Sequence, residues 1–108
     1  MIERLEAIET RYHELEIELS NPEVYSDMNK MRTLSKEKAD LEETVITYNR
    51  YKEVIEGIKD AKEMLKDAEM AELAREELEL LETEKPELES KLEILLIPKD
   101  PNDSKNVI

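Results

Sequence analysis

The sequence contains no cysteine, tryptophan or phenylalanine, and its 108 residues include one glycine and one histidine. Without cysteine the chain forms neither a disulfide nor a thiolate metal site. With one glycine it cannot build the glycine-rich loop that cradles phosphate groups. A Ser-His-Asp arrangement would have His13 as its only base. We therefore expect no enzyme activity, no cofactor and no metal site in this chain.

Charged residues are abundant, at 42% of the chain, and the net charge is −13. Residues 67–93 hold eleven acidic and three basic residues, whereas residues 28–66 are close to neutral. Most of this surface would repel a phosphate backbone, so we expect no DNA partner. No apolar run resembles a signal peptide or a membrane span, which predicts a cytoplasmic protein without a membrane partner.

Apolar residues recur every three or four positions in three segments, which predicts helices at about residues 2–19, 27–66 and 68–97. Asp27 and Asp67 are candidate N-caps for the second and third helices. The short links make neighbouring helices antiparallel. The predicted fold class is all-α: an elongated, coiled-coil-like antiparallel hairpin or bundle of three helices, with a long central helix and a projecting tip.

Two residues interrupt the predicted helices. Gly57 lies inside the central helix at a cost of about 1 kcal/mol relative to alanine, which indicates a weak point or a site of close approach. Pro86 lies inside the third helix, where it causes a kink, or a break if Thr83 caps a new helix. The apolar residues before and after Pro86 form one continuous apolar stripe at helical spacing, which favours the kink.

The last eleven residues differ from the arm formed by residues 1–97. Pro98 stops the third helix, and residues 98–108 are predicted to be a linker and the start of a strand. A strand needs a partner in a sheet, and residues 1–97 offer none. We therefore expect the chain to be part of a longer protein.

Three lysines near the predicted tip, Lys59, Lys62 and Lys66, are the candidate contact residues for RNA phosphates or an acidic partner. The favoured interpretation of their spacing is a solvated face with local pairs such as Lys59–Glu63.

Two tyrosines lie in the middle of the central helix. Tyr48 and Tyr51, with Arg50 and Lys52 beside them, would suit a base-stacking patch. The favoured interpretation is that Tyr48 is core and that Tyr51 lies at an edge, with its hydroxyl in water. His13 is expected at the surface.

The residues around the tail carry a resemblance to a known family. Leu95 to Ile108, with Pro98-Lys99-Asp100-Pro101-Asn102-Asp103 inside it, resembles the junction after the first domain of bacterial peptide chain release factor type 1, which reads UAA and UAG. Shorter segments resemble the family in the same order: Asn21-Pro22-Glu23-Val24, Leu34-Ser35-Lys36-Glu37, Tyr48-Asn49-Arg50-Tyr51-Lys52 and Ala61-Lys62-Glu63-Met64-Leu65.

The resemblance implies a role in translation termination. Release factors trigger hydrolysis of peptidyl-tRNA through a Gly-Gly-Gln loop, and a Pro-x-Thr type motif reads the stop codon. Neither motif is present here, so the resemblance implies a non-catalytic arm that contacts the ribosome. Its implied partners are the large-subunit GTPase-associated region, with its stalk-base protein and ribosomal RNA, and the recycling GTPase of termination. The alternative is a self-standing acidic coiled-coil adaptor or chaperone-like helical hairpin.

Overall fold

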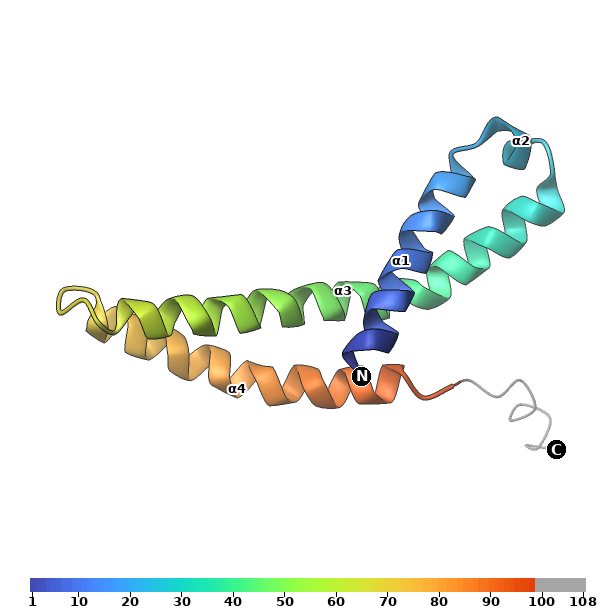
Figure 1. The fold of residues 1–108 in the computed structure, drawn as a ribbon. Helices are drawn as coiled ribbons and strands as arrows, with labels where there is room; N and C mark the ends of the chain where they lie inside the picture. Colours follow the sequence, from blue (N-terminus) through green and yellow to red (C-terminus); the bar gives the residue numbers. More distant parts are fainter. Residues whose placement is uncertain (99–108) are drawn as a thin grey trace, which may run out of the picture.

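The computed structural model describes residues 1–98, and this range holds four α-helices and no strand. They are α1 (Ile2–Leu19), α2 (Pro22–Tyr25), α3 (Met28–Met64) and α4 (Ala71–Leu95). In Figure 1, α1 lies along the first part of α3, and α4 lies along the second part. The molecule measures 60 × 41 × 19 Å along its principal axes. The predicted fold class, all-α and elongated with a long central helix, is confirmed.

The long helix α3 is bent. Figure 1 shows that it changes direction near the place where α1 lies against it, so the molecule has two arms. One arm is formed by α1, α2 and the start of α3, and the other is the hairpin of α3 and α4. The turn between α3 and α4 lies at the free end of the second arm, as a projecting tip.

The link between α1 and α3 contains the short helix α2, which the sequence analysis did not predict. Asn21 precedes Pro22 in an extended conformation, and its side chain accepts a hydrogen bond from the Glu23 N–H at 2.9 Å. Proline suits the first helical position because the N–H it lacks would have no partner there. Val24 is buried and anchors this turn. Asp27 caps α3 as predicted, accepting from the Lys30 N–H at 3.1 Å.

The turn between α3 and α4 is longer than the sequence suggested. The Asp67 carboxylate accepts from the Glu69 N–H, two residues ahead, at 3.0 Å. This bond forms a local turn, and Met70 takes the N-cap position of α4 without a side-chain cap. The prediction that Asp67 caps the third helix is therefore wrong.

The helix α4 continues unbroken through Pro86. Thr83 does not cap a new helix, because its hydroxyl donates to the Glu79 carbonyl within α4 at 2.9 Å. Proline removes the hydrogen bond that the Glu82 carbonyl would otherwise accept. Glu82 and Pro86 are both exposed, so this interruption of the hydrogen-bond pattern lies at the surface of the protein. The linker and the strand start predicted at residues 98–108 lie, from residue 99 on, outside the described residues.

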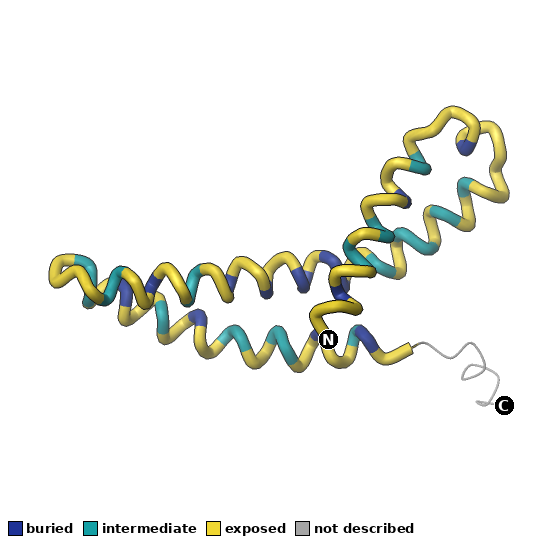
Figure 2. Tube along the Cα trace, viewed as in Figure 1, coloured by how far each residue is buried: buried dark blue, intermediate teal, exposed yellow. Residues whose placement is uncertain are grey.

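The core lies where α1, α3 and α4 meet. Its buried residues come from all three helices: Leu5, Tyr48, Tyr51, Leu92 and Leu96. Figure 2 shows the buried positions on the sides of the helices that face one another. Arg4 adds a polar contact at this junction, since its Nη2 donates to the Leu96 carbonyl at 2.8 Å. This bond holds the end of α4 against the start of α1.

Tyr51 belongs to this core, and the expectation that it lies at an edge is wrong. Tyr51 is as buried as Tyr48, and its hydroxyl donates a hydrogen bond to Glu89 Oε2 at 2.8 Å. No helix among the described residues combines the length and the apolar composition that crossing a membrane requires.

Candidate interaction surface

The three candidate lysines lie where the structure forms the tip of the α3–α4 hairpin. Lys59 and Lys62 belong to the last turns of α3, and Lys66 follows in the turn. All three side chains are exposed. A spacing of three places Lys59 and Lys62 on one side of α3, and a positive charge near the end of a helix suits its dipole.

These lysines make few contacts within the protein. Lys66 Nζ lies 3.5 Å from Glu63 Oε2, and both side chains are mostly exposed. The expected Lys59–Glu63 pair does not form among the described residues, because Glu63 turns towards Lys66 instead. Lys62 borders a shallow groove of about 370 Å³ together with Ile55 and Ile58. The lysine side chains are thus available to a partner.

A second groove, of about 310 Å³, lies on the other flank of the same hairpin. Gly57, Ala61 and Leu73 line it, and Asp60 and Glu77 stand beside them. Successive helical residues turn by about 100°, so Gly57 and Ala61 point to the side of the α3–α4 contact opposite to Ile55 and Lys62. The groove on the first flank thus has Lys62 and Lys85 together with Glu82 and Glu89, whereas the groove on the second, the carboxylate flank, has Asp60 and Glu77 and no basic residue.

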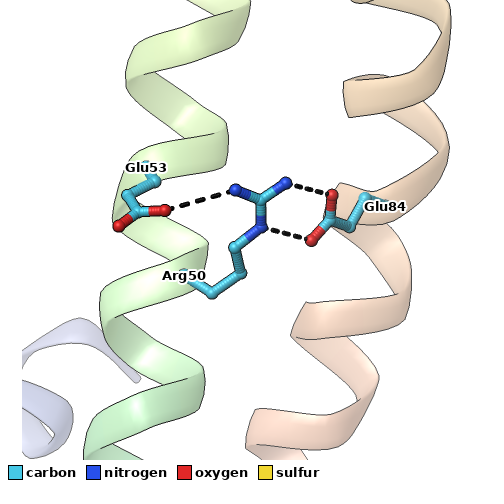
Figure 3. A network of polar contacts seen from close by, with 3 residues as sticks. All are labelled: Arg50, Glu53 and Glu84. Atoms are coloured by element: carbon cyan, nitrogen blue, oxygen red, sulfur yellow. Dashed lines mark hydrogen bonds and ion pairs between the residues drawn. The ribbon is translucent and has the colours of Figure 1, made fainter.

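An ion-pair network ties α3 to α4 between the tip and the core. Arg50 donates to both carboxylate oxygens of Glu84, from Nε at 2.6 Å and from Nη2 at 2.7 Å. Its Nη1 donates to Glu53 Oε2 at 3.2 Å, as Figure 3 shows. The guanidinium of Arg50 holds the pKa of Glu84 below its ordinary value, chiefly through these hydrogen bonds. The two-point pairing links the two helices at this position.

The tyrosines and their basic neighbours do not form an exposed stacking patch. Burial, and next the hydrogen bond to Glu89, raises the pKa of Tyr51 to about 12. Lys52 Nζ lies 4.6 Å from the centre of the Tyr48 ring and 2.9 Å from Glu9 Oε2. The base-stacking alternative is therefore wrong, because both rings are buried inside the bundle.

His13 lies on the surface, as predicted, with its Nδ1 3.0 Å from Glu16 Oε1. Among residues 1–98, no group of three or more potential ligand side chains is placed to hold a metal ion.

Comparisons with known proteins agree with one another. Residues 8–108 match the family model described as the PCRF domain. "Peptide chain release factor 1" of Exiguobacterium sp. is 57% identical over 112 residues, which cover all of this chain and 32% of the relative. The proteins of the same name from Halalkalibacterium halodurans and Enterococcus faecalis are 54% and 55% identical over 111 residues, and in each the match covers all of this chain and 31% of the relative.

The chain thus spans about a third of the length of these curated relatives. No solved structure shows a significant match to it.

Proposed function

Because this chain belongs to the peptide chain release factor 1 family, we propose that it forms the ribosome-contacting arm of a translation termination factor. The complete factor promotes hydrolysis of peptidyl-tRNA at UAA and UAG stop codons. The observation that carries this proposal is identity of 52–57% across the whole chain to proteins named peptide chain release factor 1. The resemblance at the junction after Leu95 supports it independently of the helical segments.

The arm supplies contact and not chemistry. A Gly-Gly-Gln motif needs two glycines, and the chain contains only Gly57. Hydrolysis and codon reading therefore depend on other parts of the factor. An elongated hairpin with a core at one end and a tip at the other suits a spacer that reaches a distant surface.

The proposed partners lie in the GTPase-associated region of the large ribosomal subunit, and the proposed location is the cytoplasm. The exposed Lys59, Lys62 and Lys66 fit ribosomal RNA there, since a phosphate backbone attracts positive charge. The carboxylates of the other flank fit the stalk-base protein or the recycling GTPase better, because phosphates would repel them.

A chimeric release factor tests the proposal. This chain replaces the corresponding third of release factor 1 from Enterococcus faecalis, and release of a labelled peptide is measured on ribosomes with UAA, UAG or UGA in the A site. We expect release at UAA and UAG only, with multiple turnover when the recycling GTPase is present. An unrelated acidic helical hairpin of the same length is the control, and it should reduce turnover.

Two results would contradict the proposal. One is peptide release by this chain alone, which would place chemistry in the arm. The other is a chimera that turns over no better than the hairpin control, which would favour the alternative of an adaptor without a ribosomal role.

A further inference from the structure

The carboxylate flank of the α3–α4 hairpin combines an open groove with exposed leucines. Leu73 borders the groove of about 310 Å³ and is 60% exposed, although it lies on the apolar stripe of α4. Leu80 lies seven residues further along α4 and is 70% exposed. Two large apolar side chains on one helical face, one heptad apart, are suited to a second helix lying along α4.

The groove exists because the residues at its floor are small. Gly57 has no side chain, and Ala61 and Ala74 are almost completely buried, with 2% and 1% of their surface exposed. Met64 at the end of α3 also lines the groove, but Leu73 stays 60% exposed because these α3 positions opposite it carry only small residues. The space left beside it is large enough for one apolar side chain from outside.

The charge of this flank selects the partner. Asp60 and Glu77 stand at the groove, and within residues 1–98 neither forms an ion pair with a basic side chain. Four more glutamates surround Leu80: Glu76, Glu79, Glu84 and Glu87. Among these, Glu84 is neutralised by Arg50. The flank is therefore apolar at its centre and strongly negative around it.

We propose that this flank binds a basic amphipathic helix of a partner protein. An apolar side chain of that helix enters the groove beside Leu73, a second one packs on Leu80, and lysines or arginines face Asp60 and Glu77. A nucleic acid is repelled by the same carboxylates, and a second copy of this chain would bring like charges together. The inference rests on the groove and its charge alone, and it holds whether or not the arm contacts a ribosome.

A synthetic peptide tests this interaction without ribosomes. The probe is a labelled helical peptide of about 20 residues, with leucines at heptad spacing and lysines on both sides of them. Its binding to this 108-residue chain is followed by fluorescence anisotropy. A peptide of the same composition in scrambled order measures binding due to charge alone, and analytical ultracentrifugation shows whether the chain associates with itself.

We expect the ordered peptide to bind at least about tenfold more tightly than the scrambled one. Leu73→Ser and Leu80→Ser together should remove that advantage. Asp60→Asn with Glu77→Gln should weaken binding and reduce its dependence on salt. Ile17→Ser, which changes an apolar residue 71% exposed on α1, is the matched control and should bind like the parent chain.

The proposal is overturned if the scrambled peptide binds equally well, because attraction would then need no groove. Unchanged binding by the double leucine variant would overturn it too, since the peptide would lie elsewhere. A dimer that the same leucine substitutions dissociate would show that the flank is occupied by a second copy. Circular dichroism of each variant establishes that the helices are intact.

Discussion

Leu81 occupies the space that a side chain at Gly57 would need: its Cδ1 lies 2.9 Å from the ideal position of a Cβ on Gly57. Leu81 is 7% exposed, so it is part of the contact between α3 and α4. The glycine costs α3 about 1 kcal/mol of helix propensity. In return α4 packs close to α3 at this point, which confirms the interpretation of Gly57 as a site of close approach.

Substitutions at Gly57 should separate these two effects. Gly57→Ala gains helix propensity, but its Cβ must displace only the end of the Leu81 side chain, so we expect the free energy of unfolding to change by less than about 1 kcal/mol. Gly57→Val presses branched methyl groups on Leu81 and should destabilise the protein by about 1–3 kcal/mol. Urea denaturation followed by circular dichroism measures both, and equal stability of the two variants would refute the close contact.

The core at the helix junction should dominate stability. Leu92 is completely buried among residues of α1 and α3, so Leu92→Ala should lower the free energy of unfolding by about 2–5 kcal/mol. Ile94, two residues along the same helix, is 67% exposed and is the control, with an expected change below about 0.5 kcal/mol for Ile94→Ala. A similar decrease in both variants, measured by urea denaturation, would show that the junction is not the stabilising core.

The apolar spacing predicted much of this fold because helix periodicity is local. It indicated the three long helices and their pairing, and the polar Asp27 indicated the start of α3. The apolar spacing did not reveal that Leu73 is exposed, because Leu73 belongs to the apolar stripe of α4. Leu73 is uncovered because α3 has the small residues Gly57 and Ala61 opposite it. The register between two helices determines which side chains lie opposite each apolar residue. That register cannot be read from the spacing of residues along one helix.

The positions of the candidate site residues could likewise be predicted only in part. Lys59, Lys62 and Lys66 are all exposed near the tip, and their role as contact residues stays a prediction. The partner of Tyr51 is Glu89, 38 residues away, and such a pair can be known only once α3 and α4 are aligned. Glu63 has Lys59 four residues before it and Lys66 three residues after it. It pairs with Lys66, and this pairing depends on the backbone conformation of the turn.

The buried hydroxyl of Tyr51 should make stability sensitive to alkaline pH. Its pKa is raised from 10.0 to about 12 in the folded protein, so the folded state holds this proton more tightly than the unfolded chain does. Its contribution is fully present below pH 10 and disappears as the pH rises towards about 12. We expect Tyr51→Phe to reduce the slope of the unfolding free energy against pH in this range.

Tyr25→Phe is the control for that measurement, because Tyr25 is 57% exposed, and its slope should equal that of the parent chain. If Tyr51→Phe keeps the parent slope, the hydroxyl of Tyr51 is not buried against Glu89 in solution.

The ion pair of Arg50 with Glu84 should act at acidic pH. The pKa of Glu84 is lowered from 4.5, so the unfolded chain takes up this proton more readily than the folded one. The pair therefore stabilises the protein above pH 4.5, and its contribution disappears as the pH falls through the lowered pKa. The parent chain should exceed Glu84→Gln in thermal stability at neutral pH, and the difference should shrink below pH 4.5.

Glu76→Gln removes a charge from the same helix at a residue without an ion pair among the described residues, and serves as the matched control. A difference between the parent and Glu84→Gln that stays constant down to acidic pH would mean that the carboxylate does not pair with Arg50.

The three lysines of the tip supply the last prediction, which concerns the ribosome. Each phosphate that a lysine neutralises releases counterions from RNA, so this binding makes the affinity depend on salt. In a release factor that carries this arm, Lys59→Gln, Lys62→Gln and Lys66→Gln together should weaken ribosome binding. The slope of log affinity against log salt should fall by about 1 for each phosphate that the variant no longer binds.

Lys30→Gln, Arg32→Gln and Lys36→Gln remove the same charge from exposed positions on the other arm. Because net charge changes equally in the two triple variants, equal decreases in affinity would assign the effect to overall charge and exclude specific binding at the tip.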